Sequence, residues 1–445
     1  MNTDKFRKIE LRIIVSLLLA CILMGCKNEE SKNETVEPQE TKIASQFDPR
    51  DYRFPREEGT TKSGYPVALS GKPITKKPLI LNSDETKVKD YPEYYVPGDE
   101  TLADNEMRIT IMGSGIPAPI RPAQATSCVL VQLGNGDAFI FDIGSDNVGK
   151  LYSMGLHPSE LDKVFITHLH LDHVGGIFPL FDAMGWARNT PLRVWGPSGH
   201  TPELGTKAFT QNVRRAAEWH TQSKQEKLPI GGAKFDAKEI DIDLFSPANP
   251  QQLVYDYDSV KVYAFPIVHS ISGAIGYKLE WNGLSMTFVS DSEVSTFEAE
   301  QSIGVDVLIH EVMPSAEAFA KGNKMPIEDA RRVISRHTTP QKLGYLLDVT
   351  NPRLGIGTHF KLGDETNDAL FESLRKTYKG PFLLAQDLTT INITHDYILM
   401  RQTKINPLGD PPASKSQNTQ SMTTGGPSEA IIPNWLKKTV VHLEE

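Results

Sequence analysis

Cysteine is scarce in this chain of 445 residues, which contains Cys21, Cys26 and Cys128. Cys21 would leave with the N-terminal export signal described below and Cys26 would carry a lipid, so Cys128 has no cysteine partner in the processed chain. This excludes a disulfide framework, and a folded body must be stabilised by a hydrophobic core. A closed structural zinc site, which usually takes thiolate ligands, is also disfavoured.

Positive charge is in deficit as well. The chain has 47 Lys and Arg residues against 56 Asp and Glu residues, which gives a formal net charge of −9 at pH 7. Proteins that bind polyanions usually present an excess of Lys and Arg. We therefore expect no nucleic-acid partner.

The apolar run near the N-terminus is too short for a transmembrane helix. This run, IIVSLLLACILM from Ile13 to Met24, falls short of the about 20 residues that a membrane-spanning helix needs. Basic residues precede it, and LMGC at its end is similar to a bacterial lipobox with Cys26 as the lipidated residue. We expect residues 1–26 to be a lipoprotein signal peptide. The protein would then be exported and lipid-anchored to a bacterial membrane, facing the periplasm or the cell surface; an uncleaved N-terminal anchor is the alternative.

Composition divides the remaining chain into three parts. Residues 27–105 begin with a polar segment and continue without clear periodicity, which predicts a tether and an irregular N-terminal extension. Residues 402–445 are predicted to be a low-complexity linker and a C-terminal tail. Residues 106–401 contain regularly spaced apolar segments and should form the folded domain.

Predicted strands and helices alternate within residues 106–401. Four successive strands are expected between residues 259 and 312, and helices over IEDARRVISRH and TPQKLGYLLDVT follow them. In the second helix, Thr339 is the expected N-cap and Pro340 occupies the first position. The segment INITHDYILMR is predicted to be one final strand. This alternation is typical of a layered α/β fold.

The segment FITHLHLDHVGG, residues 165–176, places His168, His170, Asp172 and His173 directly after an apolar strand. On an extended segment, His168 and His170 point the same way and can reach one metal ion, while the next pair can turn toward a second ion. Imidazole and carboxylate ligands suit zinc, manganese or ferrous iron. The motif therefore predicts a site for two divalent metal ions, with Zn²⁺ as the first expectation.

Two metal ions need more than four ligands, and suitable residues follow later strands. His269 ends FPIVH, Asp291 follows MTFVS, and His359 follows LGIGT. Layered α/β proteins gather functional loops at strand ends, so we expect these three residues to join the first four. Histidines and aspartates alone then complete the candidate ligand set.

The motifs THLHLDH, HSISGAIGY, SDS, IHEV, RHTTPQ and THF, in this order, resemble those of metallo-β-lactamase-fold hydrolases of the ribonuclease Z and arylsulfatase-like branch. MRITIMGSG, LRVWGPSG and LEWNGLSMTFVSD are similar to the metallo-hydrolases associated with guanitoxin biosynthesis. The resemblance covers roughly residues 106–400. It implies a four-layer αββα sandwich with the metals at the mouth between the two sheets. The ligand sets that it implies are His168, His170 and His269 on the first metal, Asp172, His173 and His359 on the second, and Asp291 bridging both.

The resemblance also implies catalytic roles. His337 in RHTTPQ is expected to donate a proton to the leaving group, Glu311 in IHEV to orient it, and Asp172 to contribute to catalysis as well as to metal binding. An ordinary helix C-terminal histidine is the alternative for His337. Asp142 in FIFDIG is expected to hydrogen-bond the metal loop, whereas His310 is expected to be structural.

Two departures from ribonuclease Z lead to an expected substrate. The bridging aspartate lies in SDSE rather than in the usual Gly-Asp-Thr, and residues 201–240 lack the basic arm that holds transfer RNA. We expect an exported dinuclear hydrolase that cleaves an ester or phosphodiester bond of a small molecule through a hydroxide bridging two metals. A lactonase or arylsulfatase activity is the alternative among enzymes, and a non-catalytic binding lipoprotein is the alternative of another class. The oligomeric state stays open, a dimer included.

Overall fold

The structure is a computed structural model that describes residues 91–117, 121–157, 160–185, 190–224, 234–406 and 433. The described residues all belong to one unit of the chain, Tyr52–Glu445. The predicted signal peptide with Cys26 lies outside these residues, as do most of the predicted N-terminal extension and C-terminal tail. The domain boundaries at residues 106 and 401 stay predictions. Among the described residues, no helix has both the length and the apolar character needed to cross a membrane.

A nine-stranded sheet, the first of two, has the order β1-β16-β15-β2-β3-β4-β5-β6-β7. Its strands are β1 (Tyr94–Tyr95), β2 (Met107–Gly113), β3 (Cys128–Leu133), β4 (Ala138–Phe141), β5 (Lys163–Phe165), β6 (Leu192–Pro197), β7 (Phe235–Ile240), β15 (Thr389–Ile393) and β16 (Ile398–Thr403). The strands from β4 to β7 run parallel to one another. Their carboxyl ends therefore share one edge of the sheet, where loops gather.

A seven-stranded sheet has the order β14-β13-β12-β11-β10-β9-β8. Its strands are β8 (Gln252–Tyr257), β9 (Val260–Pro266), β10 (Ile275–Trp281), β11 (Leu284–Val289), β12 (Val307–Glu311), β13 (Leu354–Thr358) and β14 (Phe382–Leu384). The four strands predicted between residues 259 and 312 are β9 to β12, so that prediction is confirmed. Asn282 and Gly283 connect β10 to β11 with φ of 48° and 74°, a conformation that suits a tight two-residue hairpin.

The described residues also form helices of four to eleven residues. They are α2 (Val148–Tyr152), α3 (Leu171–Val174), α4 (Ile177–Gly185), α5 (Thr206–Ala216), α6 (Glu218–Lys224), α7 (Thr296–Ser302), α8 (Ala316–Asn323), α9 (Ile327–Ile334), α10 (Pro340–Thr350) and α11 (Asp364–Leu374). Thr339 is the N-cap of α10 and Pro340 its first residue, as predicted, although the Thr339 side chain makes no capping hydrogen bond.

The two sheets pack face to face around a shared core. Ile109 and Phe141 from the first sheet and Val262, Tyr277 and Ile309 from the second contribute to it. Each such fully buried large side chain contributes about 1.5–3 kcal/mol relative to an exposed one. The core is continuous across both inner faces, so the sheets form the two middle layers of the domain.

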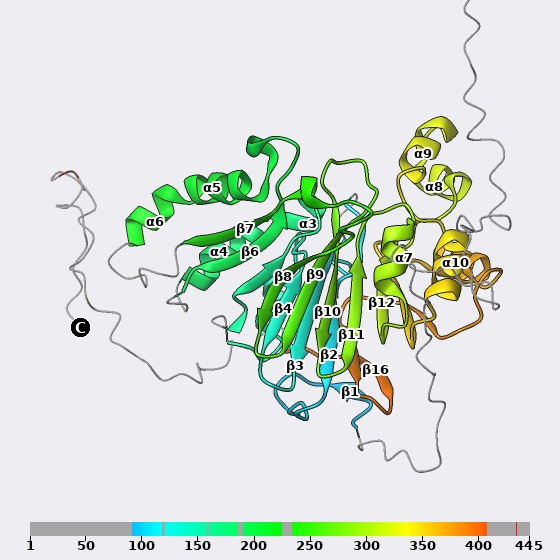
Figure 1. Ribbon diagram of the computed structural model, residues 1–445, viewed down its shortest axis with the longest axis horizontal. Helices are drawn as coiled ribbons and strands as arrows, with labels where there is room; N and C mark the ends of the chain where they lie inside the picture. The colour runs from blue at the N-terminus through cyan, green and yellow to red at the C-terminus, as the bar shows by residue number, and fades with distance from the viewer. Residues whose placement is uncertain are drawn as a thin grey trace, which may run out of the picture. The chain divides into compact units, whose positions relative to one another are not determined.

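Alternate strand residues point outward and pack against helices. On the first sheet Leu130 packs with Leu151 of α2 and Leu180 of α4, and on the second sheet Leu308 packs with Leu343 of α10. Figure 1 shows α4 and α5 to one side of the strands and α7 and α10 to the other. The predicted αββα sandwich is therefore confirmed.

The final predicted strand is wrong in one respect. INITHDYILMR contains two antiparallel strands, β15 and β16, rather than one. Thr394 makes the turn between them, because its side-chain oxygen accepts hydrogen bonds from the backbone N–H groups of Asp396 and Tyr397 at 3.2 Å and 3.1 Å. A threonine turn of this kind lacks the glycine or proline that marks most turns in a sequence.

Candidate metal centre

The predicted ligands come from both sheets and meet at the edge where several strands end. They follow β5, lie on α3, or follow β9, β11 and β13. Three overlapping groups form, and within each group one ligand atom per residue lies within 4.8 Å of all the others. The groups are His168, His170, His269 and Asp291; Asp172, His173, Asp291 and His359; and Asp291, Glu311, His337 and His359. The structure thus brings together all seven predicted ligands and both proton-transfer candidates.

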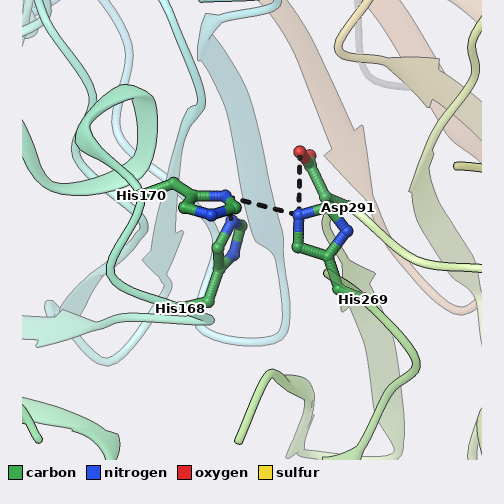
Figure 2. Close-up of side chains that lie close together, drawn as sticks. All are labelled: His168, His170, His269 and Asp291. Carbon is green, nitrogen blue, oxygen red and sulfur yellow. Dashed lines mark hydrogen bonds and ion pairs between the residues drawn. The ribbon is translucent and has the colours of Figure 1, made fainter. Parts of the chain in front are cut away.

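The first group contains three histidine rings whose nitrogens converge. His168 Nε2 lies 2.9 Å from His170 Nδ1, and His269 Nε2 lies 3.3 Å from the same His170 atom. Figure 2 shows His168 and His170 approaching from one side, with His269 and Asp291 facing them. Ligand atoms around a tetrahedral zinc ion with bonds of about 2.0–2.1 Å lie about 3.3 Å apart, so the spacing suits a metal ion.

The second group alternates imidazole and carboxylate atoms. Asp172 Oδ2 lies 3.1 Å from His173 Nε2 and 3.2 Å from His359 Nε2. Asp291 Oδ1 lies 3.4 Å from His173 Nε2 and 3.2 Å from His359 Nε2. These four atoms have a spacing similar to that of the first group and form a second set of ligands, which shares Asp291 with the first.

Asp291 belongs to both groups through different oxygens. Its Oδ1 faces His173 and His359, whereas its Oδ2 lies 3.8 Å from His269 Nε2. A carboxylate that offers one oxygen to each side can bridge two cations. The bridging position implied by the sequence resemblance therefore matches the observed geometry.

Hydrogen bonds on the outer side of the rings fix which nitrogen is free. His269 Nδ1 donates to the backbone oxygen of Arg336 at 3.2 Å, and His173 Nδ1 donates to Asp142 Oδ2 at 2.8 Å. His168 Nδ1 lies 3.1 Å from the hydroxyl of Thr167. In a neutral imidazole one nitrogen carries the proton and the other offers a lone pair. When these three rings are neutral, each Nε2 therefore offers its lone pair to the centre of the group.

Asp142 has the bracing role that the sequence predicted. It is fully buried, and its Oδ1 accepts from the backbone N–H of Thr167 at 2.8 Å. Its Oδ2 binds His173, so one carboxylate ties both ends of the THLHLDH segment. Asp142 and His359 have φ of 53° and 55°, a left-handed conformation that is unfavourable for residues other than glycine and that concentrates at functional sites.

The donor atoms fit divalent cations by a further criterion. His173 Nε2 and Asp291 Oδ1 are buried and form no hydrogen bond, although they face each other. Buried polar atoms without partners are unfavourable, and a cation between them would supply a partner to both. Imidazole and carboxylate ligands together suit zinc, manganese or iron. The residues present therefore fit a divalent metal.

Electrostatics differ between the two groups. Burial lowers the pKa of His168 well below its usual value, and the charge of His173 lowers it further, so this ring is neutral. Burial also lowers the pKa of His359, but the Asp291 charge and the Asp172 hydrogen bond outweigh it and raise the pKa to about 10. Burial raises the pKa of Asp291, yet the charges of His359 and His173 hold it well below its usual range. The second group thus holds protons where cations would bind.

His337 and Glu311 form a hydrogen-bonded pair beside the second group. His337 Nδ1 donates to Glu311 Oε2 at 2.7 Å, and it lies 3.9 Å from Asp291 Oδ2. Burial lowers the pKa of His337, but the Glu311 charge and hydrogen bond outweigh it and raise the pKa above its usual value. The ordinary C-terminal histidine considered as the alternative does not match this geometry, because His337 faces a buried carboxylate and not the end of α9.

Several supporting residues were not predicted from the sequence. Thr167 and Ser290 bind ligand rings through their hydroxyls, the second at 3.0 Å from His173 Nδ1. Each lies next to a predicted ligand at a strand end, so a Ser or Thr at such a position could have been predicted from the sequence as a residue that supports a ligand. The backbone oxygen of Arg336 binds His269, and a backbone contact leaves no trace in residue type. His310 is fully buried and lies outside the three groups.

Comparison with known proteins shows which families the chain is similar to. The family model of the Metallo-beta-lactamase superfamily matches residues 121–236, which include the THLHLDH motif. The ribonuclease Z of Mycobacterium marinum is 24% identical over 260 residues, which cover 57% of this chain and 84% of that enzyme. The ribonuclease Z of Mycobacterium bovis is 25% identical over the same share of both chains.

Solved structures of two proteins are also similar. The metallo-beta-lactamase fold protein YhfI of Bacillus subtilis has a TM-score of 0.48 and 18% identity, covering 65% of this chain and all of that one. The short form of human tRNase Z has a TM-score of 0.47 and 20% identity, covering 64% of this chain and 98% of that one.

One sequence-based expectation is overturned by the relatives. The two Mycobacterium enzymes are named as ribonucleases and point to RNA, so the predicted small-molecule substrate without a nucleic-acid partner is wrong. The physical reason is that net charge is a sum over the whole chain. It does not measure the local potential at a site, which decides where a phosphate binds.

Fold, motifs and relatives agree on one class of protein. The two ligand groups lie at the strand ends of an αββα sandwich, and the superfamily model covers the segment that supplies the first four ligands. These similarities support a metal-dependent hydrolase with the metallo-beta-lactamase fold, similar to the ribonuclease Z-like branch of that superfamily.

Proposed function

We propose that this chain hydrolyses phosphodiester bonds in RNA with two divalent metal ions held in the candidate metal centre. The observation that carries the proposal is the position of Asp291 between two complete ligand groups. Its Oδ1 lies 3.2 Å from His359 Nε2 on one side, and its Oδ2 lies 3.8 Å from His269 Nε2 on the other. Paired metal sites that share a carboxylate are typical of enzymes that cleave phosphate esters.

His168, His170 and His269 would hold the first ion, and Asp172, His173 and His359 the second, with Asp291 shared. Bound there, the ions would lower the pKa of a water molecule and neutralise negative charge on the phosphate oxygens. The protein side chains prepare this chemistry in advance. Because outer hydrogen bonds fix the rings, no reorientation is needed when ions and substrate bind.

His337 would move a proton. Its Nδ1 is bonded to Glu311, so Nε2 is the atom that can donate to the oxygen of the leaving group. The raised pKa favours the protonated ring, which is the form that a general acid requires. Glu311 orients the ring and stabilises its charge.

A negative net charge is compatible with an RNA substrate at this site. The second ligand group contributes the charges of Asp172 and Asp291, whereas two divalent ions would bring twice that charge with opposite sign. The local potential would then attract a phosphodiester although the chain as a whole carries −9. The relatives, both ribonucleases, support RNA over other phosphodiesters.

The experiment that tests the proposal combines metal content with cleavage. Full-length protein purified without chelators is assayed by plasma mass spectrometry and with an end-labelled RNA. We expect about two metal ions per chain, zinc before manganese or iron, and RNA cleavage that chelation abolishes and added metal restores. A folded, metal-loaded protein that leaves RNA intact would refute the proposal.

A pair of histidine variants separates the site from the rest of the surface. His170→Ala removes a ligand and should lower cleavage by more than the about 10–100-fold that loss of a supporting residue costs. His200→Ala is the matched control, because His200 is exposed and lies outside all three groups. We expect it to keep wild-type activity.

We also propose that the protein acts outside the cytoplasm, tethered through a lipid on Cys26. The support is the N-terminal sequence alone: basic residues, the apolar run from Ile13 to Met24, and LMGC at its end. Labelling cells with a radioactive fatty acid should mark the wild-type protein and leave Cys26→Ser unlabelled. Labelling of both proteins would contradict the lipid site.

A further inference from the structure

A buried ionisable pair lies behind Glu311 and has no role in the chemistry described above. Glu298 on α7 and His310 on β12 both have fully buried side chains. Glu298 Oε1 lies 2.7 Å from His310 Nε2. Apolar residues of similar volume often stabilise a core at least as well as a buried ionisable pair, so packing alone does not account for these two residue types.

The partners of the His310 ring fix its orientation. His310 Nδ1 lies 2.7 Å from the backbone oxygen of Glu311, and because a carbonyl oxygen can only accept, Nδ1 carries a proton. The second ring nitrogen shares a further proton with the Glu298 carboxylate. The ring is therefore held at both nitrogens and cannot turn without breaking two buried hydrogen bonds.

Glu298 also contacts the loop that follows β11. Its Oε2 lies 3.4 Å from the hydroxyl of Ser292, and the backbone N–H of Ser292 donates to Glu311 Oε1 at 2.6 Å. Glu298, His310, Glu311 and Ser292 thus form a closed loop of contacts, called here the four-residue cycle. Each member is fully buried, so water does not compete for these contacts.

The four-residue cycle is connected both to the metal-ligand loop and to the proposed proton donor. Ser292 directly follows the shared ligand Asp291, and Glu311 Oε2 accepts from His337 Nδ1. Thr338, next to His337, closes the connection because its hydroxyl donates to the backbone oxygen of Ser292 at 2.5 Å. A shift of Glu298 or His310 would therefore reach both the ligand loop and the proton donor.

We propose that Glu298 and His310 are positioning residues that fix Glu311 relative to the Asp291 loop and so set the direction in which His337 donates its proton. The catalytic part of this inference rests on the proposed function, since it requires His337 to act as an acid. The structural part, a His337–Glu311 hydrogen bond that depends on Glu298, can be measured without any substrate.

The test uses full-length protein with Glu298→Ala and Glu298→Gln, and Glu300→Ala as the control on the same helix but outside the cycle. Three quantities are measured: kcat and KM for bis(p-nitrophenyl) phosphate, metal content, and the low-field NMR signal of the His337 ring N–H. Glu298→Ala should lower kcat about 10–100-fold at unchanged KM and metal content, and weaken the His337 signal. Glu298→Gln should restore most of both, because its amide can donate to His310 Nε2 from the same place.

Two results would overturn the proposal. One is a folded Glu298→Ala protein with wild-type kcat and an unchanged His337 signal. The other is a loss of metal that parallels the loss of kcat, which would make the pair a support for the ligands alone. If Glu298→Ala does not fold, Glu298→Asp retracts the carboxylate by one methylene and makes the same test. If the wild type itself cleaves no phosphodiester, the proposed function fails, and the NMR signal still decides the positioning role.

Discussion

Replacing Asp142 by asparagine should weaken the second ligand group through a change of tautomer. Both carboxylate oxygens accept: Oδ1 from the Thr167 backbone N–H at 2.8 Å, and Oδ2 from His173 Nδ1 at 2.8 Å. An asparagine can keep only one of these acceptors. If its oxygen faces Thr167, its amide N–H faces His173 and requires the ring to offer a lone pair at Nδ1. The ring proton then moves to Nε2, the atom that would bind the metal.

The opposite amide orientation is no better, since it sets the amide N–H against the Thr167 N–H in a fully buried place. Either arrangement loses a hydrogen bond to a charged group, which contributes about 1.5–3 kcal/mol. Loss of a residue that orients a metal-binding histidine lowers metal affinity about 10–100-fold, which corresponds to about 1.4–2.8 kcal/mol. We expect Asp142→Asn to show that loss chiefly for the ion bound by His173.

The assay is a competition titration of the two ions against a chelator of known affinity, with unfolding by urea measured in parallel. Asp256→Asn is the matched control, because Asp256 is exposed on β8 and distant in sequence from every ligand. One ion should bind as in the wild type and the other more weakly. Wild-type affinity for both ions in a folded Asp142→Asn protein would refute the tautomer argument.

Further measurements test other parts of the site and fold. Removing the metal should lower the melting temperature, and ions added at about 1,000 times their Kd should restore about 4 kcal/mol; an unchanged melting curve would count against buried ions. Metal affinity should rise with pH, because the His359 pKa of about 10 means that an entering ion must displace a proton; between pH 6.5 and 7.5 the gain should be about tenfold per displaced proton, and a flat profile would contradict it. Glu311→Gln should lower kcat about 10²–10⁴-fold, and because it lowers the pKa of His337, the loss of activity as pH rises should begin at a lower pH. Tyr277→Phe should reduce the free energy of unfolding by about 1–3 kcal/mol, because it leaves the backbone oxygen of Ile166 without the 2.7 Å hydrogen bond of the tyrosine hydroxyl. Urea unfolding measures this change, and a loss clearly below about 1 kcal/mol would contradict the prediction.

The ligand positions could be predicted because their signal is local. His168 to His173 follow a strand within one short motif, and Asp291 and His359 each follow an apolar strand of their own. Strand ends at a shared sheet edge must lie close in space, so residue type and position together were sufficient. The layered fold followed from the same alternation of strands and helices.

Contacts between distant segments left no comparable trace. The pairing of Glu298 with His310 depends on how α7 packs against β12, and the contact of Arg336 with His269 uses a backbone oxygen. The hairpin of β15 and β16 was missed because Thr394 makes its turn without glycine or proline. The expectation of a small-molecule substrate without a nucleic-acid partner was wrong for a different reason, since it used the charge summed over the whole chain and not the potential at one edge of the sheets.

The charges of the centre explain why stability, metal binding and proton transfer should respond to the same conditions. Asp172, Asp291 and Glu311 lie among His173, His337 and His359, and these carboxylates raise the pKa of all three rings against the effect of burial. Protons on His173 and His359 therefore occupy the lone pairs that ions would use, whereas the proton on His337 is the one needed for catalysis. Lowering the pH adds protons to the first two rings at the expense of metal, and raising it removes the useful proton from the third. Activity should consequently be confined to a pH window whose lower limit is set by metal binding and whose upper limit is set by the Glu311–His337 pair.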